Sequence, residues 1–123
     1  MASDARAFAR IVVDGAEPPL ATAAIATTLI DRVVGLLSRR GLDGGEGLVL
    51  PRCGSIHTWF MRFAIDVVFV DGDGRATRTF ERLGPFRLAS GGSAARTAIE
   101  LPAGTLRQRG VRAGMLLRIE PGR

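Results

Sequence analysis

The stretch Cys53–Asp71, C-G-S-I-H-T-W-F-M-R-F-A-I-D-V-V-F-V-D, carries the strongest structural signal in this chain. Its second half contains Ile65–Val70, a nearly continuous apolar run, which predicts a central strand buried on both faces. Its first half brings together the only Cys, the only His and the only Trp of the chain. Rare, chemically capable side chains beside a buried strand predict a site at this place.

The flanking sequence predicts a β-rich domain. Asp71-Gly72-Asp73-Gly74 has the glycines of a hairpin turn, and Thr28 and Gly41 fit the two caps of an amphipathic helix. Residues 84–95, rich in Gly, Ser and Ala, are predicted to form a loop, and residues 101–114 two turns around a short polar segment. The helix is predicted over Thr28–Arg40, and the strands over Phe8–Val13, Leu20–Ala26, Leu48–Leu50, Ile56–Phe60, Ile65–Val70, Arg75–Phe80, Thr97–Leu101 and Met115–Ile119.

These elements predict one domain over residues 1–123, with residues 1–7 disordered. The fold class is mainly β with one α-helix, a small antiparallel barrel or sandwich of about seven to nine short strands. A hydrophobic fraction of 46% is typical of a globular chain. A single Cys suits a reducing compartment, and no signal peptide or apolar run of about 20 residues is present. We therefore expect a cytoplasmic protein without a membrane span.

The net charge of +5 is unevenly distributed. Residues 1–74 hold seven Arg and nine acidic residues, whereas residues 75–123 hold ten Arg and three. An anion- or nucleic-acid-binding module that uses Arg75–Arg118 is therefore one hypothesis. However, every basic residue is Arg, as a GC-rich genome would produce without selection for binding. The aromatic residues also lie in the neutral middle segment, so no stacking platform is interleaved with the Arg, which argues against nucleic acid as a partner.

Cys53 and His57 are the first candidate pair. On a regular strand, residues four apart are separated by about 13 Å, which is too far for a shared metal or proton. A bend at Gly54-Ser55 would let them meet as a nucleophile and a base. No other Cys or His exists to complete a zinc site, so we predict no metal and no cofactor. The structural alternative is a buried thiol and a hydrogen-bonded His.

A second group of candidates follows directly. His57, Trp59 and Met61 share one face of a regular strand, and an aromatic and sulfur-rich face with few polar groups is typical of a ligand pocket. Arg62 comes next. The alternative is ordinary core packing around a satisfied His. Neither the ligand nor the oligomeric state can be read from this pattern.

Two carboxylates complete the set. Asp66 lies inside the apolar strand and Glu100 precedes Leu101-Pro102-Ala103-Gly104. A buried carboxylate requires a partner. Asp66 is therefore either a structural group that fixes a loop or a titrating group in a site. Together the two would supply acid–base chemistry if the fold placed them side by side.

Four motifs carry a resemblance to a known family. They are G-L-L-S-R-R-G-L from Gly35, G-L-V-L from Gly47, H-T-W-F-M-R-F-A-I-D-V-V-F-V-D from His57 and I-E-L-P-A-G from Ile99. In order and spacing they resemble the domain of unknown function 192 family over residues 22–120. The resemblance implies a β-barrel-like fold with one helix and no established activity.

The family's signature residues correspond here to Met61, Asp66, Glu100, Pro102 and Gly104. The chain departs from the pattern in two places: Ala64 replaces a common Pro, and Met115 replaces a common Asp. The region from Cys53 to Thr58 is similar to a branch of the family with a Cys and the sequence S-I-H-T.

Three functions remain open from the sequence. The first is a binding or accessory domain with a pocket for a small ligand or a peptide or protein partner, lined by His57, Trp59, Met61, Arg62, Asp66 and Glu100. The second is a hydrolase-type enzyme that uses Cys53 or Asp66 with His57. The third is the anion-binding module described above.

Overall fold

The computed structural model describes residues 8–14, 18–25, 45–59 and 61–122. Its elements are β1 (Phe8–Val13), β2 (Ala21–Ile25), β3 (Glu46–Pro51), β4 (Ser55–His57), β5 (Ile65–Val70), β6 (Ala76–Leu83), β7 (Leu88–Ser90), β8 (Thr97–Pro102), α2 (Thr105–Arg109) and β9 (Leu117–Gly122). The prediction of a mainly β fold is confirmed. The helix predicted over Thr28–Arg40 lies outside the described residues.

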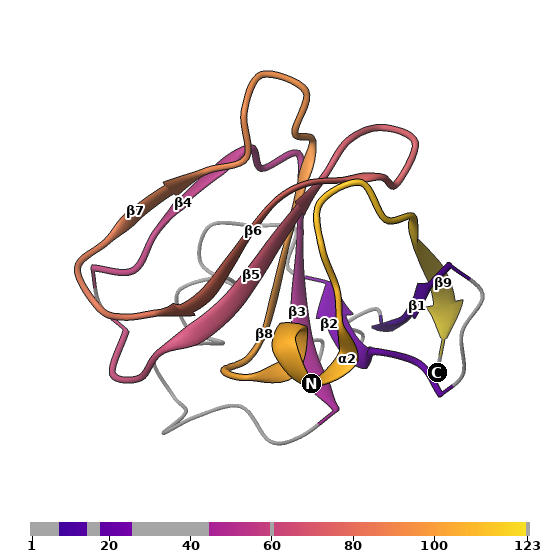
Figure 1. The fold of residues 1–123 in the computed structure, drawn as a ribbon, viewed down its shortest axis with the longest axis horizontal. Coiled ribbons are helices and arrows are strands. Elements are labelled where there is room, and N and C mark those ends of the chain that lie inside the picture. Colours follow the sequence, from indigo (N-terminus) through magenta and orange to yellow (C-terminus); the bar gives the residue numbers. More distant parts are fainter. Residues whose placement is uncertain (1–7, 15–17, 26–44, 60, 123) are drawn as a thin grey trace, which may run out of the picture.

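Seven strands form one curled sheet in the order β6-β5-β8-β3-β2-β1-β9, which makes a half-barrel (Figure 1). All its pairs are antiparallel except β2 and β3. The two end strands approach each other at one corner, where Arg75 bridges to Leu116. Gly74 makes this approach possible: its φ is +91°, and a Cβ there would lie 2.5 Å from the carbonyl oxygen of Leu117. Strands β4 and β7 form a separate pair at the left of Figure 1.

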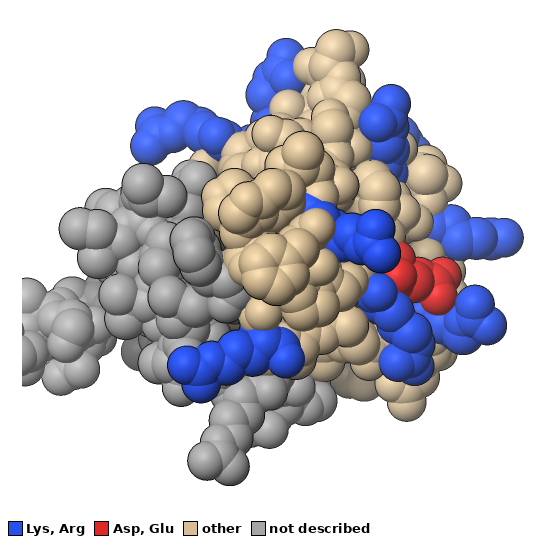
Figure 2. Space-filling model, turned by 90° about the vertical axis from the view of Figure 1, so that its left-hand side faces the viewer, with Lys and Arg blue, Asp and Glu red and all other residues tan. Residues whose placement is uncertain are grey.

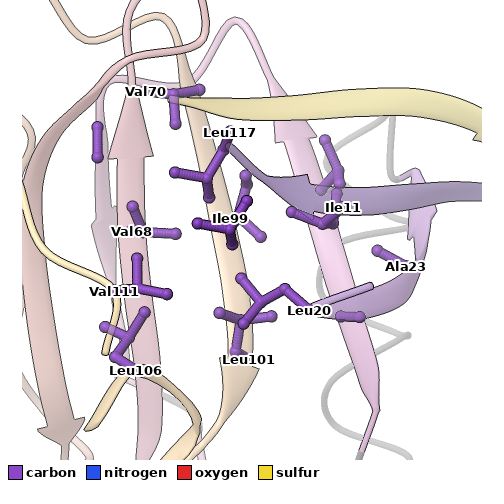
Figure 3. Close-up of a cluster of buried hydrophobic side chains, with 14 residues drawn as sticks. Ile11, Leu20, Ala23, Val68, Val70, Ile99, Leu101, Leu106, Val111 and Leu117 are labelled. Carbon is purple, nitrogen blue, oxygen red and sulfur yellow. The ribbon is translucent and has the colours of Figure 1, made fainter. Parts of the chain in front are cut away.

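Strand β5 is buried along its whole length, as predicted, because both faces of the sheet are covered there. Val68 and Val70 point into a first core, together with residues of β1, β2, β3, β8, β9 and α2 (Figure 3). Val67 and Phe69 point into a second core on the opposite face, where Ile56 of β4 and Ala89 of β7 cover them. The period of two along β5 thus divides the hydrophobic interior into two layers.

Several predictions about the elements need correction. Strands β3 and β6 extend beyond the predicted Leu48–Leu50 and Arg75–Phe80. The predicted 84–95 loop contains β7, because Leu88–Ser90 alternates exposed, buried and exposed and pairs with β4. The predicted polar segment after residue 101 contains α2, with Gly104 at its N-terminus at a φ of 96°. The last strand begins at Leu117 instead of Met115, because the Met115 N–H donates to the Arg112 carbonyl and extends the preceding turn.

Candidate functional site

Asp66 joins three backbone segments. The side chain is fully buried, and its Oδ1 accepts a hydrogen bond from the Arg82 N–H at 2.9 Å. Its Oδ2 accepts from the N–H groups of Gly104 at 3.1 Å and Leu106 at 2.8 Å. The carboxylate therefore holds the end of β6 against the first turn of α2, and its acceptor oxygens are both engaged.

Glu100 is also buried, but it lies on the other face of the sheet. In the ladder between β5 and β8, Asp66 is opposite Leu101, and Glu100 is opposite Val67. Leu101 belongs to the first core and Val67 to the second. Because neighbouring residues on a strand point to opposite faces, the two carboxylates are separated by the sheet and do not form an acid–base pair.

Cys53 and His57 are likewise on different sides of β4. The thiol of Cys53 is buried in the second core and donates to the Ser55 carbonyl at 3.0 Å. His57 is exposed. Ile56, the residue before His57, points inward, so His57 points outward. The bend at Gly54-Ser55 is present, but it does not bring the thiol and the imidazole together.

The segment after His57 leaves the strand earlier than predicted. Strand β4 ends at His57 instead of Phe60, because the Met61 N–H donates to the Thr58 carbonyl at 3.2 Å and closes a turn. His57 and Trp59 stay in contact, with ring centroids 5.4 Å apart in an edge-to-face arrangement. Met61 is half-buried against the second core, and Arg62 is exposed.

The structure adds two residues that the sequence did not single out. Leu88 on β7 lies directly opposite His57 and is 74% exposed. Phe86 donates its N–H to the Thr58 carbonyl and is 70% exposed. Trp59 is 41% exposed. The pairing of Leu88 with His57, the bond from the Phe86 N–H to Thr58 and the contact of Trp59 with His57 bring these exposed side chains to the same end of the β4–β7 pair. We call His57, Trp59, Phe86 and Leu88 the outer patch. The only available sequence signal was Phe86-Arg87-Leu88, a cluster of large side chains inside a Gly/Ser-rich segment.

The outer patch is supported by Thr58, which is buried between its members. The hydroxyl of Thr58 donates to the Gly84 carbonyl at 2.6 Å and accepts from the Arg87 N–H at 2.9 Å. These bonds hold the turn that presents Phe86. Phe86 itself has a φ of 60°, which is unusual for a bulky residue and costs on the order of 1–3 kcal/mol. A strained backbone thus displays a large apolar side chain to solvent.

Arg side chains lie along several sides of this surface. Arg87 stands between Phe86 and Leu88 in the chain, and Arg62 follows the turn at Thr58. Figure 2 views the molecule from the β4–β7 side. It shows a tan area with blue side chains above it, to its right and below it, and with red at one place only, against a blue group. The face therefore combines exposed apolar side chains with positive charge.

The acidic hairpin turn forms a different region. An open hollow of about 470 Å³ is lined there by Asp71–Gly74 and parts of β9. The hydrogen bond from the Arg75 N–H to Asp71 lowers the pKa of that carboxyl below its ordinary 3.8. Within the described ranges, no group of three or more His, Cys, Asp or Glu side chains is placed to hold a metal ion. No helix among these residues is long and apolar enough to cross a membrane.

Comparison with known proteins identifies a family and two similar folds. The sequence profile of DUF192, described as an uncharacterised family, matches residues 10–119. A proposed transcription regulator from Sinorhizobium meliloti 1021 is 21% identical, with a TM-score of 0.75 over 93% of both chains. A protein of unknown function from Novosphingobium aromaticivorans DSM 12444 is 18% identical, with a TM-score of 0.76 over 90% of this chain and 84% of the other. At these identities the likeness shows the fold alone. No curated protein matches the chain.

Proposed function

The chain belongs to the DUF192 family, and we propose that it is a binding domain that contacts a protein partner through the outer patch. The observation that carries this proposal is the display of Phe86. A buried hydrogen-bonded Thr58 fixes the turn, the backbone of Phe86 is strained, and the side chain is still 70% exposed. A fold gains no stability from such a residue, whereas exposed Trp and Phe anchors beside Arg are typical of binding hot spots.

The alternative of a hydrolase has less support. Its three candidate groups occupy three places: the thiol of Cys53 is in the second core, His57 is exposed, and Asp66 is engaged by backbone N–H groups on the first-core side. A nucleophile and its base must lie within hydrogen-bond reach. The small-ligand pocket is supported only at its outer members, His57 and Trp59, which lie on a surface instead of a cavity wall.

Site-specific photo-crosslinking in the native host tests the proposal. A photoreactive residue at Leu88 should give a defined adduct, and the same residue at Thr22, an exposed position on β2, should not. The adduct should disappear when Phe86 is replaced by Ser. After purification of that partner, Trp59→Ala should weaken its binding by about tenfold or more. The proposal would be refuted if positions 88 and 22 gave the same adduct in equal yield. It would also be refuted if the Trp59→Ala variant bound the partner as tightly as the wild type.

A further inference from the structure

The Arg residues that the structure describes fall into two groups by what their side chains contact. Most are engaged within the fold. Those that hydrogen bond to carbonyl oxygens are Arg75, Arg78, Arg96 and Arg109, and those that pair with a Glu are Arg10, Arg107 and Arg118. By contrast, five guanidinium groups make no hydrogen bond or ion pair with any residue in the described part of the chain, namely those of Arg52, Arg62, Arg82, Arg87 and Arg112.

Two of them adjoin the outer patch: Arg62 follows the turn at Thr58, and Arg87 stands between Phe86 and Leu88 in the chain. The guanidinium of Arg82 instead lies near Gly104, at the start of α2. Residues 52–64 and 78–96 together contain six Arg and one acidic residue, Glu81, a balance of +5. Glu81 is already paired with Arg107 at 3.1 Å. The face therefore carries uncompensated positive charge around exposed apolar side chains, and its complement is a surface with negative charge around an apolar centre.

We propose that the partner of the outer patch presents an acidic protein segment. Apolar side chains of that segment would pack on Trp59, Phe86 and Leu88, while its carboxylates would pair with Arg62 and Arg87. Guanidinium groups suit this role because their planar donor fork binds a carboxylate with two hydrogen bonds. This inference rests on the proposed function and specifies the chemistry of the partner.

The composition of the patch favours protein over the other anionic partners. Leu88 is 74% exposed and has no ring on which a base could stack. The rings of His57 and Trp59 already pack on each other at 67°. Ser55 and Ser90 pair on the same outward face of β4–β7 and are exposed. Polar residues at that position limit how deeply the face could enter a bilayer.

The test uses the purified full chain and a fluorescent peptide of alternating Glu and Leu. We expect saturable binding that weakens with added salt. The double variant Arg62→Gln/Arg87→Gln should weaken it by about tenfold or more. Arg112→Gln is the matched control, because its side chain also has no partner among the described residues but lies after α2. This variant should bind like the wild type.

Four outcomes would overturn the inference. They are no binding of the peptide, equal binding of a Gln/Leu peptide, unchanged binding by the double Arg variant, and tighter binding to oligothymidylate or to anionic phosphatidylglycerol vesicles. The last would indicate a nucleic acid or a membrane. If the photoreactive residue at position 88 gave a defined protein adduct together with any of these results, the proposed protein-binding function would still hold. Only the inference of an acidic partner would then fail, so the two proposals can be refuted separately.

Discussion

At Asp66, one carboxylate accepts hydrogen bonds from N–H groups of Arg82, Gly104 and Leu106. Asp66→Asn keeps the size but turns an oxygen acceptor into a donor that faces a backbone N–H. We expect the free energy of unfolding to fall by about 2–4 kcal/mol, because hydrogen bonds to a charged group are lost and a buried donor stays unsatisfied. Urea denaturation measures this loss.

The control for Asp66 is Asp73→Asn at an exposed position of the hairpin turn. Surface substitutions away from buried contacts usually change stability by less than about 0.5 kcal/mol. Equal urea midpoints for the two variants would show that the carboxylate of Asp66 is not structural. The alternative hypothesis, that Asp66 is a titrating group in a site, would then be favoured.

Gly91 is a second residue whose role is set by its surroundings. A Cβ at this position would lie 2.4 Å from Cγ of Phe69 and 2.6 Å from Cβ of Ala95. Gly91→Ala should therefore destabilise the fold by about 1–3 kcal/mol through overpacking of the second core. Gly72→Ala is the matched change, since nothing lies within 4 Å of its added Cβ, and it should be neutral or slightly stabilising. Thermal unfolding of both variants tests this prediction. Equal melting temperatures for Gly91→Ala and Gly72→Ala would contradict it.

At the scale of elements, Thr58 links β4 to the turn before β7. Thr58→Val keeps the shape but removes the bonds to the Gly84 carbonyl and the Arg87 N–H. We expect a loss of about 1–3 kcal/mol from the unsatisfied backbone groups and faster hydrogen exchange at the Arg87 amide. Thr22→Val, at an exposed position of β2, serves as the control. Unchanged exchange at Arg87 would mean that Thr58 does not hold the turn.

The elements differ in how far the sequence could predict them. Strand β5 was predicted with correct bounds, because an apolar run covered on both faces leaves a direct composition signal. Strand β7 was missed, because three residues inside a Gly/Ser-rich segment form a strand only through pairing with β4. Helix α2 was missed for a similar reason: Asp66, distant in sequence, receives the N–H groups of its first turn.

The candidate surface was only half predictable. His57 and Trp59 were visible as rare residues, and a turn at Thr58 kept them together. Phe86 and Leu88 join them through the register that places Leu88 opposite His57. A single sequence contains no information on such pairing between distant segments. The interpretation that the aromatic residues are not interleaved with the Arg overlooked Arg87, which follows Phe86 directly in the chain.

At the scale of the whole molecule, β5 is shared by the two hydrophobic cores. Val68 packs in the first core and Val67 in the second, and both are fully buried. The β4–β7 pair has no interior of its own and covers the second core through Ile56 and Ala89. Loss of either core would expose one face of the same strand. The geometry therefore predicts that both layers unfold as one cooperative unit.

The single Trp makes this prediction measurable. Trp59 follows β4 and reports on the pair that covers the second core, whereas far-ultraviolet circular dichroism reports on the strands of both layers. We expect the two signals to give the same urea midpoint. Val67→Ala and Val68→Ala should each reduce the free energy of unfolding by about 1–3 kcal/mol. Each variant should therefore show a lower urea midpoint that both signals still share. If the Trp59 signal changed at lower urea than the dichroism, the β4–β7 pair would be a separate unit. The outer patch would then belong to a segment that opens while the half-barrel stays folded.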